Sequence, residues 1–415
     1  MKKLFYQGLI FKEFYFSGTL SCADLSERIG KSLPFTMKIL NELIKEGYVT
    51  ESGYAPSSGG RRPVMYSIKP DTIYIVSVAM DQFVTRISIM DIQNQHIGDI
   101  ERFELPLVNN SEALFVLAEK IAEVIRKSKI DKKKIVGVGI GMPGFIDFKK
   151  GINYSFLENK DKTITQYLSE KISLPVYIDN DSSLIALAEL RFGNARYQKN
   201  AMVINIGWGV GLGMILNGEL FRGHNGFAGE FSHIPLFNNN KLCSCGKTGC
   251  METETSLLVI IEKATQGLKQ GRQSGLGKNF PTGHYEQDYE AIIKAALKGD
   301  QFTVELLSEV GYNIGRGVAI LIHLINPESV ILSGRGALAG KVLQAPIQQA
   351  LNTDCIPRLA ANTVVEVSNL GYQAELIGSA ALVMEHSVRE NTRLTAKEKK
   401  GHQKDSHREN LNISS

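Results

Sequence analysis

One short stretch of the chain, HIPLFNNNKLCSCGKTGCME, concentrates side chains that bind metals: His233 and three of the five cysteines, Cys243, Cys245 and Cys250. One imidazole and three thiolates suit a tetrahedral Zn²⁺, and Gly246 permits the tight turn that brings two sulfurs to one ion. Four protein ligands leave no open position for water, so the pattern predicts a structural zinc rather than a hydrolytic one. The alternative is a group of buried free cysteines in a reducing cytosol.

The length and composition indicate a cytoplasmic protein of several domains. At 415 residues the chain exceeds one compact core, and domains of roughly 100 to 200 residues predict two to four units. The apolar fraction of 43% and charged fraction of 22% are ordinary for a globular protein. Lys12 and Glu13 interrupt the apolar N-terminal stretch, which argues against a signal peptide. No apolar run approaches the roughly 18 residues that a membrane span needs, so we expect no membrane partner.

Positive charge is concentrated at the two ends of the chain. Residues 1–70 carry ten Lys or Arg against six Asp or Glu, and residues 389–415 carry seven against four, which leaves a mildly acidic body. A basic end on an acidic body predicts that the end contacts a polyanion. The last segment has very few apolar residues, so we expect a disordered polar tail over residues 389–415.

Residues 21–46 show the pattern of two short helices joined by a tight turn. Ser21 is a suitable N-cap for the first helix and Gly30 a suitable end, and Gly47 ends the second. A short strand, the glycine-rich loop SSGGRRP and a second strand follow. This order predicts a winged helix-turn-helix DNA-binding domain over residues 1–70.

A helix-turn-helix places the N-terminal residues of its second helix against base edges in the major groove. The candidate DNA contacts are Lys31, Ser32, Pro34, Phe35, Met37, Lys38, Lys45, Arg61 and Arg62. Phe35 could touch a thymine methyl group, and the paired wing arginines suit phosphates or a narrow minor groove. The alternative is a small helical unit with a solvated charged face.

Residues 71–388 alternate predicted strands and helices. Strands are predicted at 73–79, 86–90, 134–140, 175–178 and 202–206, and helices at 111–127 and within 180–193. Strand 134–140 is apolar on both faces, as in sheets that are covered on both sides. The order predicts an α/β architecture in two lobes with a cleft between them.

Taken together, these motifs resemble the ROK family (repressors, open reading frames and kinases), in its branch of transcriptional regulators similar to xylose and N-acetylglucosamine repressors. The resemblance covers roughly residues 15–385 and depends on SSGGRRP, GVGIGMPGFID, DNDSSLIALAELRFG, GHNGFAGEFSH and CSCGKTGCME. It implies a two-lobed, actin-like and ribonuclease-H-like body of the ATPase type behind the winged helix-turn-helix.

The resemblance also implies a sugar site. The sugar-binding positions of the family correspond here to Gly144, Asn180, Asp181, Glu230, His233 and Glu252. Carboxylates and an amide can pair with vicinal hydroxyls, and a neutral His233 can bind zinc through one nitrogen and donate from the other. The alternatives are a helix N-cap for Asp181 and an ordinary surface carboxylate for Glu230.

In the sugar kinases of the family, the residue matching Asp181 is the general base, and glycine loops hold the phosphates of ATP. This chain departs from both loops, because Ala79 stands where the family has aspartate, Asp81 where it has glycine, and Trp208 where kinases have a small hydroxyl residue. A carboxylate at Asp81 would repel phosphate and fill the space of the backbone amides. We therefore expect neither ATP nor Mg²⁺ as a cofactor and no catalytic residue.

The sequence thus predicts a sugar-responsive DNA-binding regulator, a repressor of carbohydrate-utilisation genes whose kinase-like body is a sensor. Its predicted partners are double-stranded operator DNA, a small sugar or sugar derivative, and further copies of itself in a homodimer or tetramer. One alternative is an active ATP-dependent sugar kinase of glucokinase or N-acetylhexosamine kinase type, with Asp181 catalytic and a DNA-binding domain attached. Another is a body that serves only as a dimerisation platform, against which the set of polar sugar-site residues argues.

Overall fold

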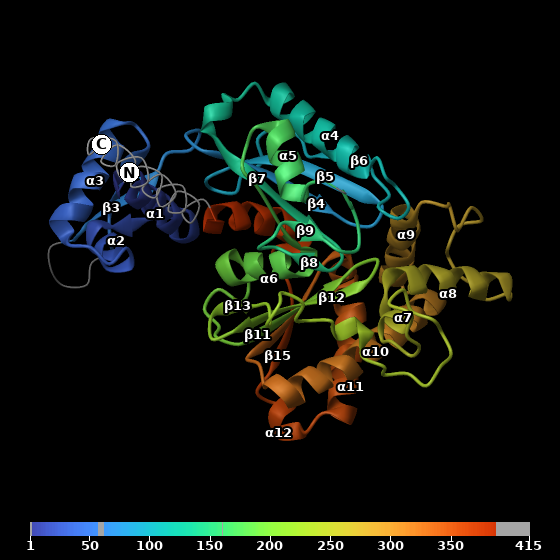
Figure 1. Cartoon of the computed structure of the whole chain (residues 1–415). Helices are drawn as coiled ribbons and strands as arrows, with labels where there is room; N and C mark the ends of the chain where they lie inside the picture. Colours follow the sequence, from blue (N-terminus) through green and yellow to red (C-terminus); the bar gives the residue numbers. More distant parts are fainter. Residues whose placement is uncertain (1, 57–61, 160, 387–415) are drawn as a thin grey trace, which may run out of the picture.

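The computed structural model describes residues 2–56, 62–159 and 161–386. Arg61 and the tail at 389–415 therefore lie outside the described residues. Figure 1 shows a small N-terminal head beside a larger body that has two lobes. Among the described helices, none is both long and apolar enough to cross a membrane.

The head is a winged helix-turn-helix. Its elements are α1 (Lys2–Ser17), β1 (Leu20–Ser21), α2 (Cys22–Arg28), α3 (Leu33–Lys45), β2 (Val49–Tyr54) and β3 (Val64–Ile68), with the antiparallel strand order β1-β3-β2. The N-cap predicted at Ser21 is confirmed as a capping box, in which its hydroxyl accepts from the Asp24 amide and the Asp24 carboxylate accepts from the Ser21 amide. Helix α1 was not anticipated; its buried Ile10 and Phe14 pack in one core with Leu40.

The first lobe contains a five-stranded sheet. Its strands are β4 (Tyr74–Met80), β5 (Val84–Asp91), β6 (Glu101–Glu104), β7 (Ile135–Met142) and β10 (Val176–Asn180), and a small hairpin of β8 (Ile146–Asp147) and β9 (Ile152–Asn153) lies beside it. Helices α4 (Ala113–Ser128) and α5 (Ile164–Ile172) cover one face (Figure 1).

The second lobe contains another five-stranded sheet with its own helices. The strands are β11 (Ala201–Ile206), β12 (Val210–Leu216), β13 (Glu219–Phe221), β14 (Ser329–Ser333) and β15 (Val364–Val367). The helices are α7 (Glu252–Thr255), α8 (Leu257–Lys269), α9 (Tyr285–Leu297), α10 (Gln301–Ile325), α11 (Lys341–Asp354) and α12 (Pro357–Ala360).

The two sheets repeat one topology. In order they read β6-β5-β4-β7-β10 and β13-β12-β11-β14-β15. In each sheet three antiparallel strands are followed by two strands that pair in parallel. This duplication agrees with the predicted two-lobed, actin-like and ribonuclease-H-like body.

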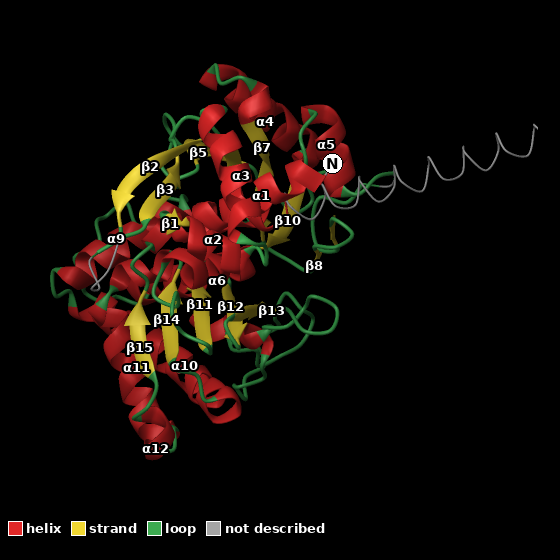
Figure 2. Cartoon of the chain, turned by 90° about the vertical axis from the view of Figure 1, so that its left-hand side faces the viewer, coloured by secondary structure: helices red, strands yellow, loops and turns green. Residues whose placement is uncertain are grey.

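Two helices join the lobes at the centre of the body. Helix α6 (Asp181–Phe192) lies between the two sheets (Figures 1 and 2) and is buried along most of its length. The helix at 374–386 returns to the first lobe, where the Ser379 hydroxyl donates to the Val78 carbonyl at 2.9 Å. Gly139 is required beneath this helix, because a Cβ there would lie 1.9 Å from the Ser379 carbonyl oxygen.

Candidate functional site

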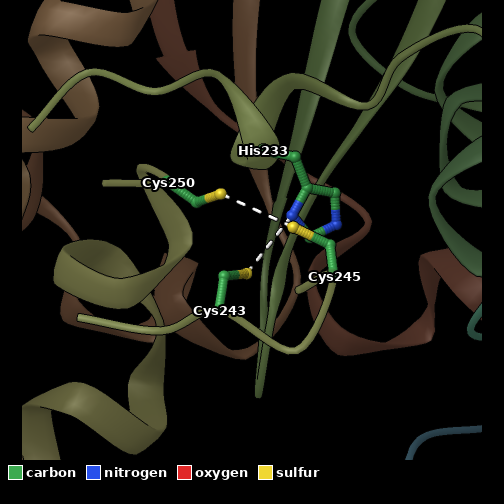
Figure 3. Close-up of side chains that lie close together, drawn as sticks. All are labelled: His233, Cys243, Cys245 and Cys250. Carbon is green, nitrogen blue, oxygen red and sulfur yellow. Dashed lines mark hydrogen bonds between the residues drawn. The ribbon is translucent and has the colours of Figure 1, made fainter. Parts of the chain in front are cut away.

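Four predicted metal ligands lie together at one point of the second lobe (Figure 3). The ligand atoms of His233, Cys243, Cys245 and Cys250 all lie within 4.8 Å of one another. The Cys243 sulfur is 3.5 Å from His233 Nδ1, and the sulfurs of Cys245 and Cys250 are 3.6 Å apart. Tetrahedral zinc with its usual bond lengths separates such ligands by about 3.5 to 3.8 Å. The cluster therefore fits a metal ion of this kind.

The loop geometry explains how two neighbouring cysteines reach one point. Gly246 has a φ of +82°, and its amide donates to the Cys243 carbonyl at 2.9 Å to close the turn. Gly249 also has a positive φ, and a Cβ there would lie 2.2 Å from the Phe237 carbonyl oxygen. The turn predicted at Gly246 thus has the backbone conformation that glycine favours.

All six predicted sugar-site residues line one cavity of about 460 Å³ between the lobes. Gly144, Asn180 and Asp181 come from the first lobe and the start of α6, while Glu230, His233 and Glu252 come from the second lobe. The cavity volume falls within the ~300 to 1,000 Å³ that is typical of small-molecule sites. Segments far apart in the sequence therefore meet at one polar pocket.

The N-terminus of α6 supplies the first two polar groups of the cavity. The N-cap is Asn180 rather than Asp181, since the Asn180 oxygen accepts from the Ser182 and Ser183 amides and its nitrogen donates to the Gly144 carbonyl at 3.3 Å. Asp181 is free of the capping role, and burial raises the pKa of its carboxyl while two hydrogen bonds from Ser182 oppose that shift. The N-cap alternative for Asp181 is therefore wrong.

Asn205 is a polar residue of this site that sequence reasoning missed. It lies on β11, and its side-chain nitrogen donates to the Asp181 carboxylate at 3.3 Å and to the Ser182 hydroxyl at 3.2 Å. An amide within an otherwise apolar strand, AMVINI, is the signal that could have identified it. Its hydrogen bonds fix the carboxylate that faces the cavity.

The segment 230–252, which contains the four predicted metal ligands, supplies the remaining three polar side chains of the cavity. His233 directs Nδ1 toward the cysteines, and its Nε2 lies 3.7 Å from the Glu230 carboxylate. Partial desolvation in the cavity raises the pKa of Glu230, and the nearby carboxyl groups of Glu252 and Asp181 add to that shift. Glu252 begins α7, and its carboxylate accepts from the Val210 amide at 3.3 Å. One loop therefore carries both metal ligands and cavity-lining groups.

Arg335 lines the part of the cavity near the two glycine loops that depart from the family pattern. Its guanidinium lies 2.9 Å from the Asp81 carboxylate, which also accepts from the Phe83 and Val84 amides at 2.8 Å. The same guanidinium lies 4.9 Å from the Trp208 ring centre and 4.8 Å from that of Tyr372. Two residues that depart from the kinase loops, Asp81 and Trp208, thus bind one buried arginine.

A second buried contact between an arginine and a carboxyl group lies beside the first. Arg86 is 3.1 Å from the Glu375 carboxylate, and its guanidinium lies 3.6 Å from the centre of the Tyr372 ring. Burial raises the pKa of Glu375 to about 8, and the charge of Arg86 opposes that shift. Among the described residues that line the cavity, Arg86 and Arg335 are therefore each bound to a carboxyl group of the chain itself.

Helix α3 presents one polar stripe to solvent on the head. Pro34, Lys38, Asn41 and Lys45 recur at helical spacing and are exposed, while the opposite face is buried. Lys31, Ser32 and Phe35 are exposed at the start of the helix, and Met37 is half-buried beside the stripe. Asn41 is a further candidate contact that sequence reasoning missed, since it lies beyond the N-terminal turn.

Three of the predicted DNA contacts have partners within the head. The Lys31 ammonium lies 5.4 Å from the Tyr6 ring centre. The Phe35 ring packs edge-on against Tyr6 at a centroid distance of 5.0 Å. Arg62 donates from Nε to the Ala55 carbonyl at 2.6 Å and lies 6.0 Å from the Tyr54 ring centre. These contacts hold the guanidinium of Arg62 against the wing backbone.

Comparison with known proteins agrees with this architecture. The ROK family model matches residues 83–386. A xylose repressor from Caldicellulosiruptor bescii is 30% identical over 392 residues, which cover 91% of this chain and 94% of that protein. A glucokinase from Halalkalibacterium halodurans is 32% identical over 291 residues, 68% of this chain and 88% of that protein.

A crystal structure has the same fold along nearly the whole chain. It is a ROK family transcriptional regulator described as a homologue of the E. coli MLC protein, with a TM-score of 0.75 and 24% identity over 93% of this chain and 97% of that one. Family match, curated relative and fold agree, and the chain belongs to the ROK family.

Proposed function

We propose that this protein is a sugar-responsive DNA-binding repressor whose kinase-like body senses the sugar without phosphorylating it. One observation carries the proposal: helix α6 begins at the polar cavity and ends against the DNA-binding head. Residues 1–70 bind operator DNA in this proposal, and residues 71–388 form the sensor. The xylose repressor that matches 91% of this chain supports the same assignment.

Sugar recognition in this proposal uses the six lining residues. Asp181, Glu230 and Glu252 accept from sugar hydroxyls, Asn180 and His233 add an amide and an imidazole, and Gly144 lines the same cavity. Carboxylates and an imidazole converging on one cavity match the paired donors and acceptors of vicinal hydroxyls.

Zinc is the metal that best fits the cluster, with His233, Cys243, Cys245 and Cys250 as its ligands. The bound ion would act structurally, by fixing the loop and the tautomer of His233. The Nε2 nitrogen of His233 then points toward the Glu230 side of the cavity as a hydrogen-bond donor.

Phosphoryl transfer is disfavoured by the groups near the glycine loops. Transfer depends on positioning a nucleotide and neutralising its phosphates. Here Arg335 lines that side of the cavity between Trp208 and Tyr372, and its charge is balanced by Asp81. Asp181 accordingly serves as a sugar ligand rather than as a general base.

A contact between head and body supplies the route for the signal. At the end of α6, the Phe192 ring meets Tyr15 and Phe16 of α1 at centroid distances of 5.4 and 5.9 Å. Arg191 lies 4.7 Å from the Phe16 ring centre and 2.7 Å from the Glu385 carboxylate. A shift of α6 at the cavity therefore changes how the head packs against the body.

In a homodimer or tetramer, this shift would alter the separation of two heads on a pseudo-palindromic operator. Half-sites one helical turn apart require recognition helices about 34 Å apart. A sugar that binds one lobe arrangement better shifts the population toward it, and a mismatch in spacing releases the DNA.

The test combines three readouts on the purified full-length chain. D-Xylose, D-glucose and N-acetylglucosamine are titrated with ATP and Mg²⁺ while melting temperature and ADP are followed, and a duplex selected from random DNA by the wild type reports binding. We expect one sugar to raise the melting temperature and weaken DNA binding without forming ADP. The Asp181→Asn variant should lose the sugar response and keep DNA binding.

Two outcomes would overturn the proposal. Sugar-dependent ADP formation that Asp181→Asn abolishes would make the chain a kinase. Absence of any selectable duplex would remove its role as a DNA-binding regulator.

A further inference from the structure

Three aromatic rings form a cluster at the rim of the sugar cavity. They are Phe145 and Tyr154 on the first lobe and Phe227 on the second, and we refer to them as the rim cluster. The Phe227 ring meets Phe145 at a centroid distance of 5.7 Å and Tyr154 at 6.1 Å, both edge-on. Phe145 is 41% exposed and Tyr154 is 58% exposed. Clustered exposed aromatic surface beside a polar cavity is typical of a binding surface.

Both halves of the rim cluster are adjacent in sequence to candidate sugar-binding residues. Phe145 follows Gly144, and Phe227 precedes Glu230 by three residues. Phe145 and Phe227 line the cavity. Tyr154 is a described residue, but it is not one of those that line the cavity. The ring of Tyr154 therefore extends the aromatic surface beyond the cavity into solvent.

The backbone that carries Phe145 and Tyr154 is held by a buried asparagine. Asn153 is 4% exposed; its oxygen accepts from the Ser155 amide at 2.8 Å, and its nitrogen donates to the Pro143 carbonyl at 2.9 Å. The Tyr154 amide donates to the Phe145 carbonyl at 2.8 Å. These bonds fix the backbone that carries both rings before any ligand binds.

The same segment is joined to the sugar site directly. The Asn180 side chain donates to the Gly144 carbonyl, so a cavity residue and the rim segment share one hydrogen-bond network. Gly144 has a φ of +102°, and a Cβ there would lie 2.7 Å from the Ser155 Cβ. Glycine is thus needed where the rim segment passes the cavity.

We propose that the rim cluster is a second subsite, which binds the second ring of a neutral disaccharide or glycoside whose first ring occupies the cavity. This inference rests on the proposed sugar-sensing function. A pyranose ring offers an apolar C–H face to an aromatic ring while its hydroxyls remain in water at the edges. The exposed rings of Phe145 and Tyr154 match that face.

The charges of the cavity select a neutral ligand. Arg335 is paired with Asp81, and Arg86 donates to the Tyr372 carbonyl and to the Glu375 carboxyl, so both guanidinium groups are engaged within the chain and neither is available for a phosphate group. The carboxylates of the proposed sugar site would repel an anion. A neutral saccharide with two rings satisfies both the polar cavity and the aromatic rim.

The experiment compares matched pairs of saccharides by calorimetry on the full-length chain: D-xylose with xylobiose, D-glucose with cellobiose and maltose, and N-acetylglucosamine with chitobiose. The variants are Tyr154→Ala and Tyr154→Phe, and Tyr197→Ala is the matched control because Tyr197 is a tyrosine exposed at 88%. DNA release is followed with the same sugars.

We expect one disaccharide to bind roughly 3- to 10-fold more tightly than its monosaccharide, the gain of one aromatic contact. Tyr154→Ala should remove that gain and leave the monosaccharide affinity within about twofold, since the ring lies outside the cavity lining. Tyr154→Phe should keep the gain, and Tyr197→Ala should change neither affinity.

A monosaccharide that binds and releases DNA, with no tighter disaccharide, would overturn the subsite and leave the proposed function standing. Equal weakening of both saccharides by Tyr154→Ala would overturn it too, because the ring would then belong to the primary cavity. If no saccharide bound, the proposed sugar-sensing function would be refuted, and the subsite would be refuted with it.

Discussion

The contact between Phe192 and helix α1 gives the sharpest test of how sugar binding reaches DNA. In the Phe192→Ala variant the two ring contacts with Tyr15 and Phe16 are lost, while Arg191 keeps its contacts with Phe16 and Glu385. Aromatic pairs contribute about 0.5 to 1.5 kcal/mol each beyond burial of area. We call the state in which the head packs against the end of α6 the docked state, and the loss of two pairs destabilises it by about 1 to 3 kcal/mol. The docked population falls by roughly 5- to 150-fold relative to the undocked one.

Coupling between two sites cannot exceed the free energy that distinguishes the two states. We therefore expect Phe192→Ala to bring the ratio of DNA dissociation constants with and without sugar close to one. Sugar affinity itself should change little, since Phe192 lies at the other end of α6. The assay is fluorescence anisotropy with the selected duplex at fixed salt, with and without saturating sugar.

Phe11→Ala is the matched control for this experiment. Its ring packs against Tyr48 within the head at a centroid distance of 5.6 Å, so the variant loses an aromatic contact of the same kind inside the head. The Phe11→Ala variant should have a less stable head. The fraction of this variant that is folded should keep the wild-type ratio of DNA dissociation constants with and without sugar. A Phe192→Ala protein that kept the full wild-type ratio would refute the route through α6.

Further predictions concern the metal, the buried acid and the recognition helix. Cys245→Ser should reduce bound zinc, measured by atomic emission, and weaken sugar binding, whereas Cys355→Ser, a free buried cysteine outside the cluster, should do neither. The pKa of Glu375 is raised from 4.5 to about 8 in the folded chain, so the stability it contributes is fully present below about pH 4.5 and is lost as pH rises through about 8. Glu375→Gln should flatten that part of the curve of melting temperature against pH. Asn41→Ala should relax base preference at one operator position by about 1 to 3 kcal/mol, whereas Lys45→Ala should weaken all duplexes alike and lower the salt slope by about one, both measured by binding to mutated duplexes.

The sequence predicted those parts of the site that depend on contiguous motifs. The metal ligands lie within one short segment, and the N-cap at Ser21 is a local signal, so both could be identified without knowledge of the fold. The sugar-site residues come from several segments, and the resemblance to a family joined them. Their meeting at one cavity follows from the parallel strand β10, whose carboxyl end delivers Asn180 to the cleft.

Residues that act through tertiary contacts could not be predicted. Helix α1 has apolar residues around much of its circumference, and its role depends on packing against both α3 and the body. Phe192 reads as an ordinary apolar helix residue until α1 is placed beside it. Arg335 lies in no motif, and its role could not be inferred because its partners come from distant parts of the chain.

The contacts of Arg335 show that the changes in the two glycine loops are not independent of each other. Asp81 and Trp208 stand in separate motifs and, from the sequence, look like independent losses of phosphate binding. In the fold they bind one buried guanidinium, which without Asp81 would keep only the more distant Glu286 carboxylate, 3.8 Å away, as an ion-pair partner. Losing the nearer partner of a buried charge costs several kcal/mol. Restoring glycine at one loop would therefore leave Arg335 in the cavity and weaken its support, without recreating a phosphate site. The two substitutions act together, and the side of the cleft that holds nucleotide in a kinase serves here as a contact between the lobes.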